Sequence, residues 1–364
     1  MHRATHVLLI VAFAAVMLAP TLATLCRFDP MGSLDENRAL AKRPTTALMS
    51  RATLRTPSTV AQQWEMYFGD HFGFRKLLIG TYRLVLFHLL QISPNPGVVV
   101  GKSDGKSRWL FLDADVTKQG IGFQSLLGKS PYGSADLATI TSNLKRMSEL
   151  ARTRGVRLLI AVCPDKQTVY PEYLPARMRP KPGTISRLDQ FWAAAAGLEG
   201  VPLVDLRIPL AKAKGQLDLY YPTDTHWNWR GAMVGYEAIA KALQAQDSTW
   251  EPMATRSLPW QLGQPLIGDL AKLMGLPTFH GDEFPLVTLP KPEALGSNRH
   301  GKLLVLGDSF FNSMAPYFEL QFDSVKKIDG RMMAGAPWLT PTLLDVEKPD
   351  VVLVESIERH WTEP

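Results

Sequence analysis

The hydrophobic and polar positions of this chain follow two alternating patterns, one typical of buried strands and one typical of helices. Continuous apolar runs, which parallel strands show when both faces of a sheet are covered, occur at VRLLIAVCP (156–164), VPLVDLR (201–207), KLLVLGD (302–308) and DVVLVESI (350–357). Apolar residues at helical spacing lie between these runs, at ADLATITSNLKRMSELARTRG (135–155), TISRLDQFWAAAAGLEG (184–200), RGAMVGYEAIAKALQAQ (230–246) and in a segment that starts at Phe310. This alternation predicts an α/β domain with a mainly parallel sheet sandwiched by helices. A hairpin is expected ahead of it, at GVVVGKSDGKSRWLFLD (97–113).

The N-terminus carries a targeting signal. A short leading segment with Arg3 precedes an uncharged apolar stretch from Val7 to Leu25, which is typical of a signal peptide or a signal anchor. Thr21 and Ala23 suit the small-residue positions of a cleavage site, whereas the length of the stretch favours an uncleaved anchor. Arg3 on the leading side favours an N-terminus in the cytoplasm and the bulk of the chain outside it.

A helical extension is expected between the apolar stretch and the hairpin. The segment TVAQQWEMYFGDHFGFRKLLIG (59–80) has Trp64, Phe68 and Phe72 on one helical face, which predicts an amphipathic helix packed on another element. The next segment, TYRLVLFHLLQI (81–92), is apolar, short and contains Arg83. It is therefore expected to be a buried helix or strand rather than a second membrane span.

These patterns divide the chain into three parts. Residues 1–30 form the signal anchor or signal peptide, residues 31–97 a linker with the helical extension, and residues 98–364 one α/β domain. Within that domain residues 242–300 are rich in proline and irregular, which indicates an insertion at the functional rim of the sheet.

Composition narrows the classes of function. The 364 residues are 46% hydrophobic and 20% charged, as in globular proteins. Two cysteines, Cys26 and Cys163, make neither a disulfide framework nor a metal site. Without a glycine-rich phosphate loop or a metal-ligand cluster in the sequence, we expect no cofactor, no metal and no nucleic-acid partner. A net charge of +6 suits an acidic partner such as an anionic polysaccharide or lipid head groups, although the charges are spread out.

Ser309 is the first candidate for chemistry. It directly follows the apolar run KLLVLGD and precedes a predicted helix, and functional groups of open α/β sheets gather at the carboxyl ends of the strands. A tight turn there would expose the hydroxyl beside backbone N–H groups that can stabilise an oxyanion. Gly307 would let the backbone turn closely. The alternative is simple turn chemistry, with Asp308 or Ser309 capping the helix.

A second motif, YYPTDTHWNWRGA (220–232), favours catalysis. Asp224 and His226 are two residues apart in a loop before a helix. A serine hydroxyl is a poor nucleophile until an imidazole takes its proton, and that imidazole needs a carboxylate to hold its tautomer. We therefore predict that Ser309, His226 and Asp224 act together. Trp227, beside His226, provides either an aromatic wall for a sugar ring or part of the core.

The motifs DTHW followed by Arg-Gly-Ala, together with the downstream GDSF, resemble the AlgX/AlgJ-like family of alginate-type polysaccharide O-acetyltransferases, relatives of the SGNH hydrolases. Further blocks in the family's order are WEMYFGDHFGFRKLLI, GKSDGKSRWLFLD, PDKQTVYPEYLP and VESIERHW, so the resemblance covers most of residues 36–361. It implies a three-layer α/β/α SGNH-like fold with a Ser309, His226 and Asp224 triad. It also implies a periplasmic site anchored to the inner membrane, and a membrane-bound O-acyltransferase partner that delivers the acetyl group.

Two departures from the family affect finer expectations. The chain ends at Pro364, soon after the ER block, and so resembles the anchored single-domain members. Many relatives have a tyrosine where this sequence has His360, which bears on the acceptor contact or its pH behaviour. The backbone N–H of Ser309 and Asn312 are expected to hold the oxyanion. Arg331 is a candidate for gripping substrate, with a surface turn as the alternative.

The activity expected from these residues and from the resemblance is acetyl transfer in two steps. Ser309 takes an acetyl group, and a hydroxyl of an exported polysaccharide then attacks the acetyl-serine, with His226 as base in both steps. The same triad would make an acetyl esterase if water reached the intermediate first. A third possibility, from another class, is a non-catalytic scaffold of an exopolysaccharide export complex.

Overall fold

The computed structural model describes residues 2–26, 39–44, 57–276, 281, 283–290, 299–329 and 339–361. The chain forms two compact units, one of Met1–Asn95 with Ala271–Phe279, the other of Pro96–Leu270 with His280–Pro364. The predicted site residues that the structure describes all belong to the second unit.

The first unit is helical where it is described. It contains α1 (His2–Leu25), α2 (Pro57–His71), α3 (Arg75–Leu84) and the short π-helix η3 (Val85–Leu89). In α1 the segment Ala4–Thr24 has a mean hydropathy of 2.4 and is long enough to cross a membrane. The single amphipathic helix predicted over residues 59–80 is wrong in one respect, because α2 ends at His71 and α3 starts anew at Arg75.

The apolar segment at residues 81–92 contradicts its prediction. It was expected to be buried, but Tyr82 is 62% exposed, Leu89 75% and Ile92 54%, while Phe87 is buried. Hydrophobicity predicts burial only where another element covers the apolar face, and the described part of the chain does not cover these side chains. The helical conformation itself follows the prediction.

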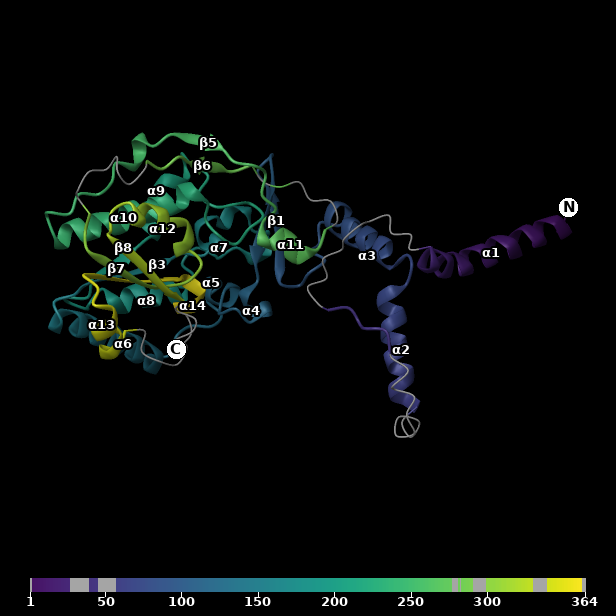
Figure 1. The fold of residues 1–364 in the computed structure, drawn as a ribbon, viewed down its shortest axis with the longest axis horizontal. Helices are drawn as coiled ribbons and strands as arrows, with labels where there is room; N and C mark the ends of the chain where they lie inside the picture. Colours follow the sequence, from purple (N-terminus) through teal and green to yellow (C-terminus); the bar gives the residue numbers. More distant parts are fainter. Residues whose placement is uncertain are drawn as a thin grey trace. The chain divides into compact units, whose positions relative to one another are not determined.

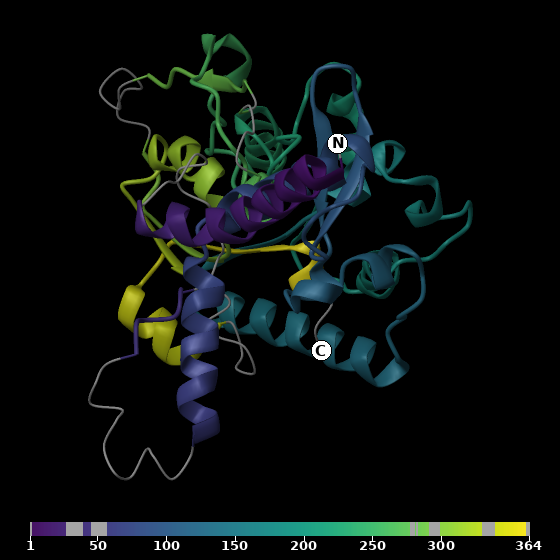
Figure 2. The same cartoon turned by 90° about the vertical axis from the view of Figure 1, so that its right-hand side faces the viewer.

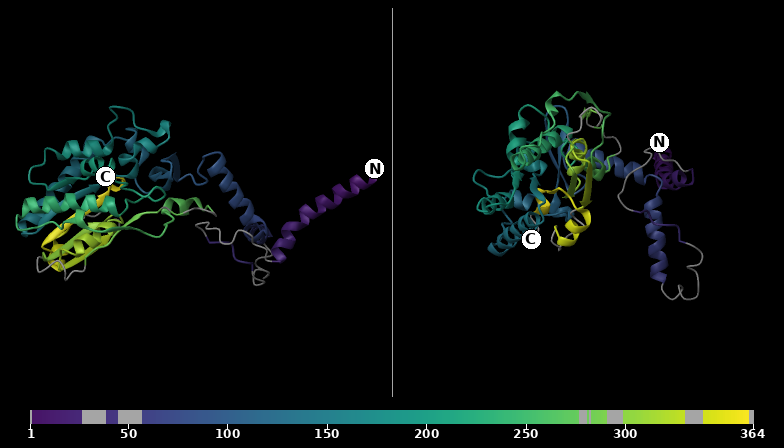
Figure 3. Two further views of the ribbon diagram at one scale, coloured as in Figure 1. Left: turned by 90° about the horizontal axis from the view of Figure 1, so that it is seen from above. Right: turned by 60° about the vertical axis from the view of Figure 1, so that its left-hand side comes forward.

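A five-stranded parallel sheet forms the centre of the second unit, in the order β4-β3-β9-β7-β8 (Figure 1). The strands are β3 (Arg157–Cys163), β4 (Leu203–Asp205), β7 (Lys302–Gly307), β8 (Ser324–Asp329) and β9 (Val351–Ile357). Two antiparallel pairs lie outside this sheet, β1 (Val98–Ser103) with β2 (Arg108–Leu112), and β5 (Trp260–Leu262) with β6 (Pro285–Val287) (Figures 1 and 3). The first pair is the predicted hairpin.

Alternate residues of each central strand point to opposite faces, and helices cover both. Leu303 and Val305 of β7 join one core cluster with side chains of α10 (Trp229–Gln246) and α12 (Phe311–Glu319). Leu304 and Leu306 join another, with side chains of α6 (Ser134–Thr153), α8 (Arg187–Ala195) and α13 (Pro341–Glu347). Figures 1 and 2 show these helical layers on either side of the sheet. The predicted three-layer α/β/α fold is therefore confirmed.

Strand β8 is missing from the sequence-based prediction for a physical reason. It is an edge strand with the sequence SVKKID, exposed or half-buried along its length, so it lacks the apolar run that marks a strand covered on both faces. The shorter helices were also not predicted individually. They are α4 (Ala114–Thr117), α5 (Phe123–Leu126), α7 (Lys166–Val169), η4 (Pro171–Tyr173), η5 (Ala176–Met178), α9 (Arg207–Lys214), η6 (Thr255–Ser257), α11 (Asp269–Met274) and α14 (Glu358–Trp361).

Candidate active site

Ser309 lies in the turn between β7, which ends at Gly307, and α12, which starts at Phe311. The turn is held by the buried carboxylate of Asp308, which accepts hydrogen bonds from the backbone N–H of Phe310 (2.9 Å) and of Ile357 at the end of β9 (2.8 Å). Burial alone would raise the pKa of Asp308, but bonds from His360 and these two N–H groups outweigh burial and lower the pKa. Helix α12 has Phe310 at its N-cap and no side-chain capping bond, so Asp308 shapes the turn ahead of the helix rather than capping it. The Ser309 hydroxyl is left for another partner.

Gly307 is required by its neighbour rather than by backbone flexibility. A Cβ atom there would lie 2.6 Å from Oε2 of Glu355 on β9, and Gly307 has no positive φ. Glu355 is fully buried, with its Oε1 accepting from the Cys163 thiol at 3.0 Å. Burial and the charge of Asp308 raise the pKa of Glu355 well above its ordinary value. The Glu355 carboxyl thus packs against Gly307, at the end of the strand that precedes Ser309.

His226 connects Ser309 to a carboxylate. The Oδ1 atom of Asp224 accepts from the backbone N–H of His226 (2.9 Å) and from its Nδ1–H (2.7 Å). On the other side of the ring, His226 Nε2 is 2.8 Å from Ser309 Oγ. Because Nδ1 holds its proton against the carboxylate, Nε2 is the nitrogen that can accept the serine proton. This arrangement has the chemistry of an activated nucleophile.

Asp224 is held as a carboxylate. Burial would raise its pKa, but the side-chain bond and positive charge of His226, together with backbone N–H donors, lower the pKa to about 2. Its loop is held from below by Lys166, whose ammonium donates to the carbonyls of Tyr221 (3.1 Å), Pro222 (3.1 Å) and Asp224 (2.5 Å). The carboxylate therefore stays ionised across the physiological pH range.

Trp227 is a core residue. Its side chain is fully buried, its ring contacts that of Phe310 edge-to-face at 5.2 Å, and its Nε1–H donates to the Phe310 carbonyl at 3.0 Å. It presents no face to a ligand, so the aromatic-wall interpretation is wrong and the core alternative applies. Through this bond, the residue after His226 is tied to the residue after Ser309.

Three further predicted site residues are Asn312, His360 and Arg331. Asn312 is exposed on the first turn of α12, and its Oδ1 accepts from Lys327 at 2.7 Å. His360 Nδ1 lies 3.3 Å from Asp308 Oδ2, so His360 reaches the Ser309 turn through that carboxylate. Arg331 lies outside the described residues.

Two further residues at the site were missed by sequence reasoning. Lys327 of β8 donates to the carbonyl of Asp308 (2.7 Å) as well as to Asn312, and so ties the Ser309 turn to the edge strand. Asp269, in the proline-rich insertion, accepts from the N–H (2.8 Å) and hydroxyl (2.6 Å) of Thr225. Neither has a local signal, since one is a lysine of an unmarked strand and the other an aspartate in irregular sequence.

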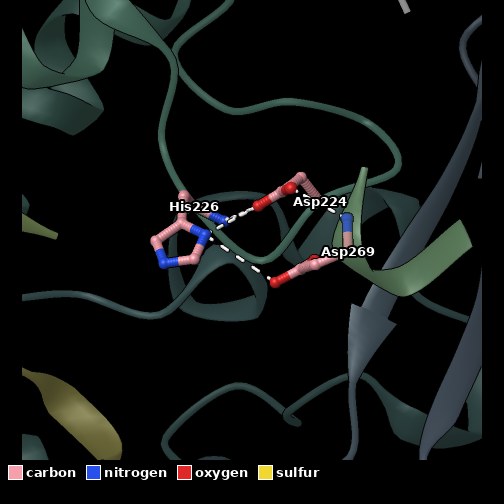
Figure 4. A group of neighbouring side chains, drawn as sticks. All are labelled: Asp224, His226 and Asp269. Carbon is pink, nitrogen blue, oxygen red and sulfur yellow. Dashed lines mark hydrogen bonds and ion pairs between the residues drawn. The ribbon is translucent and has the colours of Figure 1, made fainter. Parts of the chain in front are cut away.

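Among the described residues, a group with the residue types of a metal site consists of Asp224, His226 and Asp269. One ligand atom from each lies within 4.8 Å of the others (Figure 4). These atoms, however, already hydrogen-bond within the group or to Thr225. The arrangement fits a hydrogen-bond network around an imidazole better than a cation site.

The fold and the Ser309 turn define an SGNH-hydrolase-like protein, and comparison with known proteins gives its family. The model of a family described as "SGNH hydrolase-like domain, acetyltransferase AlgX" matches residues 103–310. This chain belongs to that family. The match contains Asp224, His226 and Ser309.

Curated relatives agree with this family, and a solved structure shares the fold. A "Probable alginate O-acetylase AlgJ" of Pseudomonas syringae pv. tomato is 24% identical over 302 residues, 81% of this chain and 66% of the relative. The protein of the same name from Pseudomonas aeruginosa is 31% identical over 245 residues, 65% of this chain and 54% of the relative. The matches thus span about half to two thirds of these relatives. Bacillus cereus PatB1, solved with a sulfonyl adduct, shares the fold with a TM-score of 0.53 and 15% identity over 74% of this chain and 98% of that one.

Proposed function

We propose that this protein is an O-acetyltransferase that moves an acetyl group through an acetyl-Ser309 intermediate onto hydroxyls of an exported polysaccharide. The observation that carries the proposal is the continuous relay from Asp224 through His226 to Ser309, with contacts of 2.7 and 2.8 Å. The names of the curated relatives, alginate O-acetylases, support acetyl transfer to a polysaccharide as the reaction class.

In the first step His226 Nε2 takes the proton of Ser309 as Oγ attacks the carbonyl carbon of the acetyl donor. A bond forms between Oγ and that carbon, and the donor's leaving group departs with the proton from the imidazolium. Asp224 stabilises the imidazolium, which is why its ionised state at neutral pH is needed. The product is acetyl-Ser309.

In the second step a sugar hydroxyl attacks the acetyl carbon of acetyl-Ser309. His226 Nε2 takes the hydroxyl proton, the new ester bond forms, and the proton returns to Ser309 as its bond to the acetyl group breaks. The negative oxygen of each tetrahedral intermediate needs N–H donors. We assign these to the Ser309 backbone N–H and the Asn312 amide, because the Lys327 ammonium on Oδ1 leaves the Nδ2 end of that amide as the donor.

We base a proposed location and proposed partners on the N-terminal helix and the family. The apolar helix Ala4–Thr24 suits an uncleaved signal anchor in the inner membrane, with the second unit in the periplasm. We also propose a membrane-bound O-acyltransferase as the donor partner, which the family resemblance implies. The expected division into an anchor, an extension to residue 97 and an acetyltransferase domain from residue 98 belongs to this proposal. His360 and Arg331 remain candidates for the acceptor contact.

The test compares full-length wild type with the Ser309→Ala variant, both purified in detergent. Each is incubated with an acetyl ester donor and a panel of oligosaccharides, and acetylation of protein and sugar is followed by mass spectrometry. We expect acetyl on Ser309 and on one class of sugar with wild type only. Ser313→Ala, a serine one helical turn further on, is the matched control and should retain activity.

Each other outcome selects a different function. Free acetate without acetylated sugar, lost in Ser309→Ala, would favour the acetyl esterase. The absence of any turnover in a folded wild-type protein would overturn the enzyme assignment and favour a scaffold of an export complex.

A further inference from the structure

A short segment of the proline-rich insertion packs directly on the loop that carries Asp224 and His226. At Gly268 a Cβ atom would lie 2.2 Å from the carbonyl oxygen of Thr223 and 2.6 Å from the backbone nitrogen of Asp224. The two backbones are therefore in contact at a distance that only glycine permits. The Gly268 N–H also lies 3.3 Å from the Thr223 hydroxyl. This close approach places the next residue, Asp269, beside the imidazole.

Asp269 contacts all three consecutive residues Asp224, Thr225 and His226. Figure 4 draws its contacts with Asp224 and His226. Its backbone N–H donates to Asp224 Oδ2 at 2.8 Å, the oxygen that does not face His226. Its Oδ1 and Oδ2 accept the N–H and hydroxyl of Thr225, at 2.8 and 2.6 Å. Its Oδ2 also lies 3.7 Å from His226 Nδ1.

We propose that Asp269 is a positioning residue for the acyl-transfer reaction, which holds the Asp224 carboxylate in line with His226 and adds a second negative charge beside the imidazole. The inference rests on the proposed function, because it assigns Asp269 to the same nucleophilic step. The contacts of Asp269 that carry this role are with the loop residues and not with the nucleophile. It acts through Thr225, Asp224 and His226.

The hydrogen bonds around Asp269 fit a negatively charged carboxylate. Both carboxylate oxygens of Asp269 accept from Thr225, so the geometry fits its ionised form. The Thr225 hydroxyl donates its hydrogen to Asp269, so its oxygen can accept a bond from His226 Nδ1, 3.2 Å away. Partial burial and the charge of Asp224 raise the pKa of Asp269, as expected for two carboxylates that face one imidazole.

The charge effect should be moderate. The Asp269 side chain is 45% exposed, so water screens it. The charged groups around the imidazole are Asp224, Asp269 and, behind the Asp224 carbonyl, the ammonium of Lys166. Removing Asp269 leaves Asp224 in place, and the imidazolium that forms during attack keeps one of its two carboxylates.

Asp269→Asn separates the charge from the backbone contact, because the N–H bond to Asp224 does not depend on the side chain. We would measure the rate at which a sulfonyl fluoride labels Ser309 in the full-length protein between pH 4.5 and 9, in parallel with acetyl transfer. The expected plateau rate is about five- to twentyfold lower, since the nearby charge is lost and an amide nitrogen can no longer accept the Thr225 hydroxyl bond. The acidic limb of the pH–rate profile should move to lower pH, because the imidazole loses a nearby negative charge. The shift should be about one pH unit or less, as expected for unit charges at this separation in water.

Two further variants keep the test decisive. Thr225→Val removes the hydroxyl between Asp269 and His226 with little change of shape, and should lower the plateau in the same direction even if Asp269→Asn folds poorly. Asp345→Asn, an aspartate on α13 that is 64% exposed and pairs with Arg154, is the matched charge control and should leave rate and pH profile unchanged.

The outcomes separate this inference from the proposed function. If Asp269→Asn leaves the plateau rate and the acidic limb of the pH–rate profile unchanged, the charge role is overturned. A lower plateau rate with the limb at the same pH would overturn it as well. If wild type is labelled at Ser309 and Asp269→Asn behaves as expected, but no acetyl is transferred, the proposed function fails and the inference stands. If wild-type Ser309 is not labelled at all, both fail.

Discussion

Trp227 joins the two halves of the site, and its replacement by phenylalanine should cost both stability and turnover. The variant loses the indole N–H that donates to the buried Phe310 carbonyl at 3.0 Å. The Phe310 carbonyl is at the N-cap of α12 and still accepts the first helical bond, so losing the indole bond costs about 0.5–1.5 kcal/mol. The smaller ring also leaves a cavity of about 40 Å³, worth about 1 kcal/mol at roughly 24 cal/mol per Å³. The free energy of unfolding should therefore fall by about 1.5–2.5 kcal/mol.

Turnover should fall because Trp227 and Phe310 directly follow His226 and Ser309. With the bond between them gone, the contact of 2.8 Å between His226 Nε2 and Ser309 Oγ is less well held. A base that is poorly placed slows proton transfer without weakening substrate binding. The expected result is a lower kcat with an acceptor KM within about twofold of wild type.

The assay combines urea unfolding with steady-state kinetics over a range of acceptor concentrations. Trp229→Phe is the matched control, because Trp229 is only half-buried and its backbone carbonyl, not its ring, accepts from Tyr317. It should lose less than about 1 kcal/mol. If Trp227→Phe unfolded at the same urea concentration as wild type while the acceptor KM rose severalfold, Trp227 would have to face the ligand after all, and our reasoning would be refuted.

Three other predictions address charge and reactivity. Asp224→Asn should lower turnover by about three to four orders of magnitude in single-turnover assays, because an amide cannot hold the imidazole tautomer; a loss under tenfold would remove Asp224 from the relay. Burial and the neighbouring Asp165 raise the pKa of Glu358 from 4.5 to about 8, so its stabilising neutral form is lost as pH rises through this range. Glu358→Gln should thus match wild type near pH 5 and be more stable by about 1–3 kcal/mol near pH 8.5 in urea unfolding; an equal difference at both pH values would contradict this. Burial and Glu355 raise the pKa of the Cys163 thiol well above its ordinary value, so iodoacetamide should modify exposed Cys26 but not Cys163, as read by mass spectrometry.

The central strands and the amphipathic helices could be predicted from the sequence because each pattern records which faces of an element are buried. The continuous apolar runs at β3, β7 and β9 reflect helices on both sides of the sheet, and alternate residues do enter separate cores. The same reasoning failed for elements whose burial does not match their hydrophobicity. Strand β8 lies at an edge and is polar, whereas Leu89 is apolar and 75% exposed.

The candidate site could be predicted in part, for a similar reason. Asp224 and His226 are two residues apart, and Ser309 sits at a recognisable strand end, so local motifs suggested all three. Their catalytic roles stay a prediction. The side chain of Trp227 could not be assigned, since neighbours in sequence point in different directions and only packing decides which one is buried.

What the sequence determined by itself is local: the periods of strands and helices, the apolar N-terminal helix, and the residue types able to activate a serine. What only the tertiary structure decided is which distant groups meet. His226 and Ser309 are 83 residues apart in the chain, Thr225 and Asp269 44, and Asp308 and Lys327 19. Such contacts depend on strand order and on the path of the insertion, which no local pattern records, because the energies that select them arise only when the sheet and its covering layers pack together.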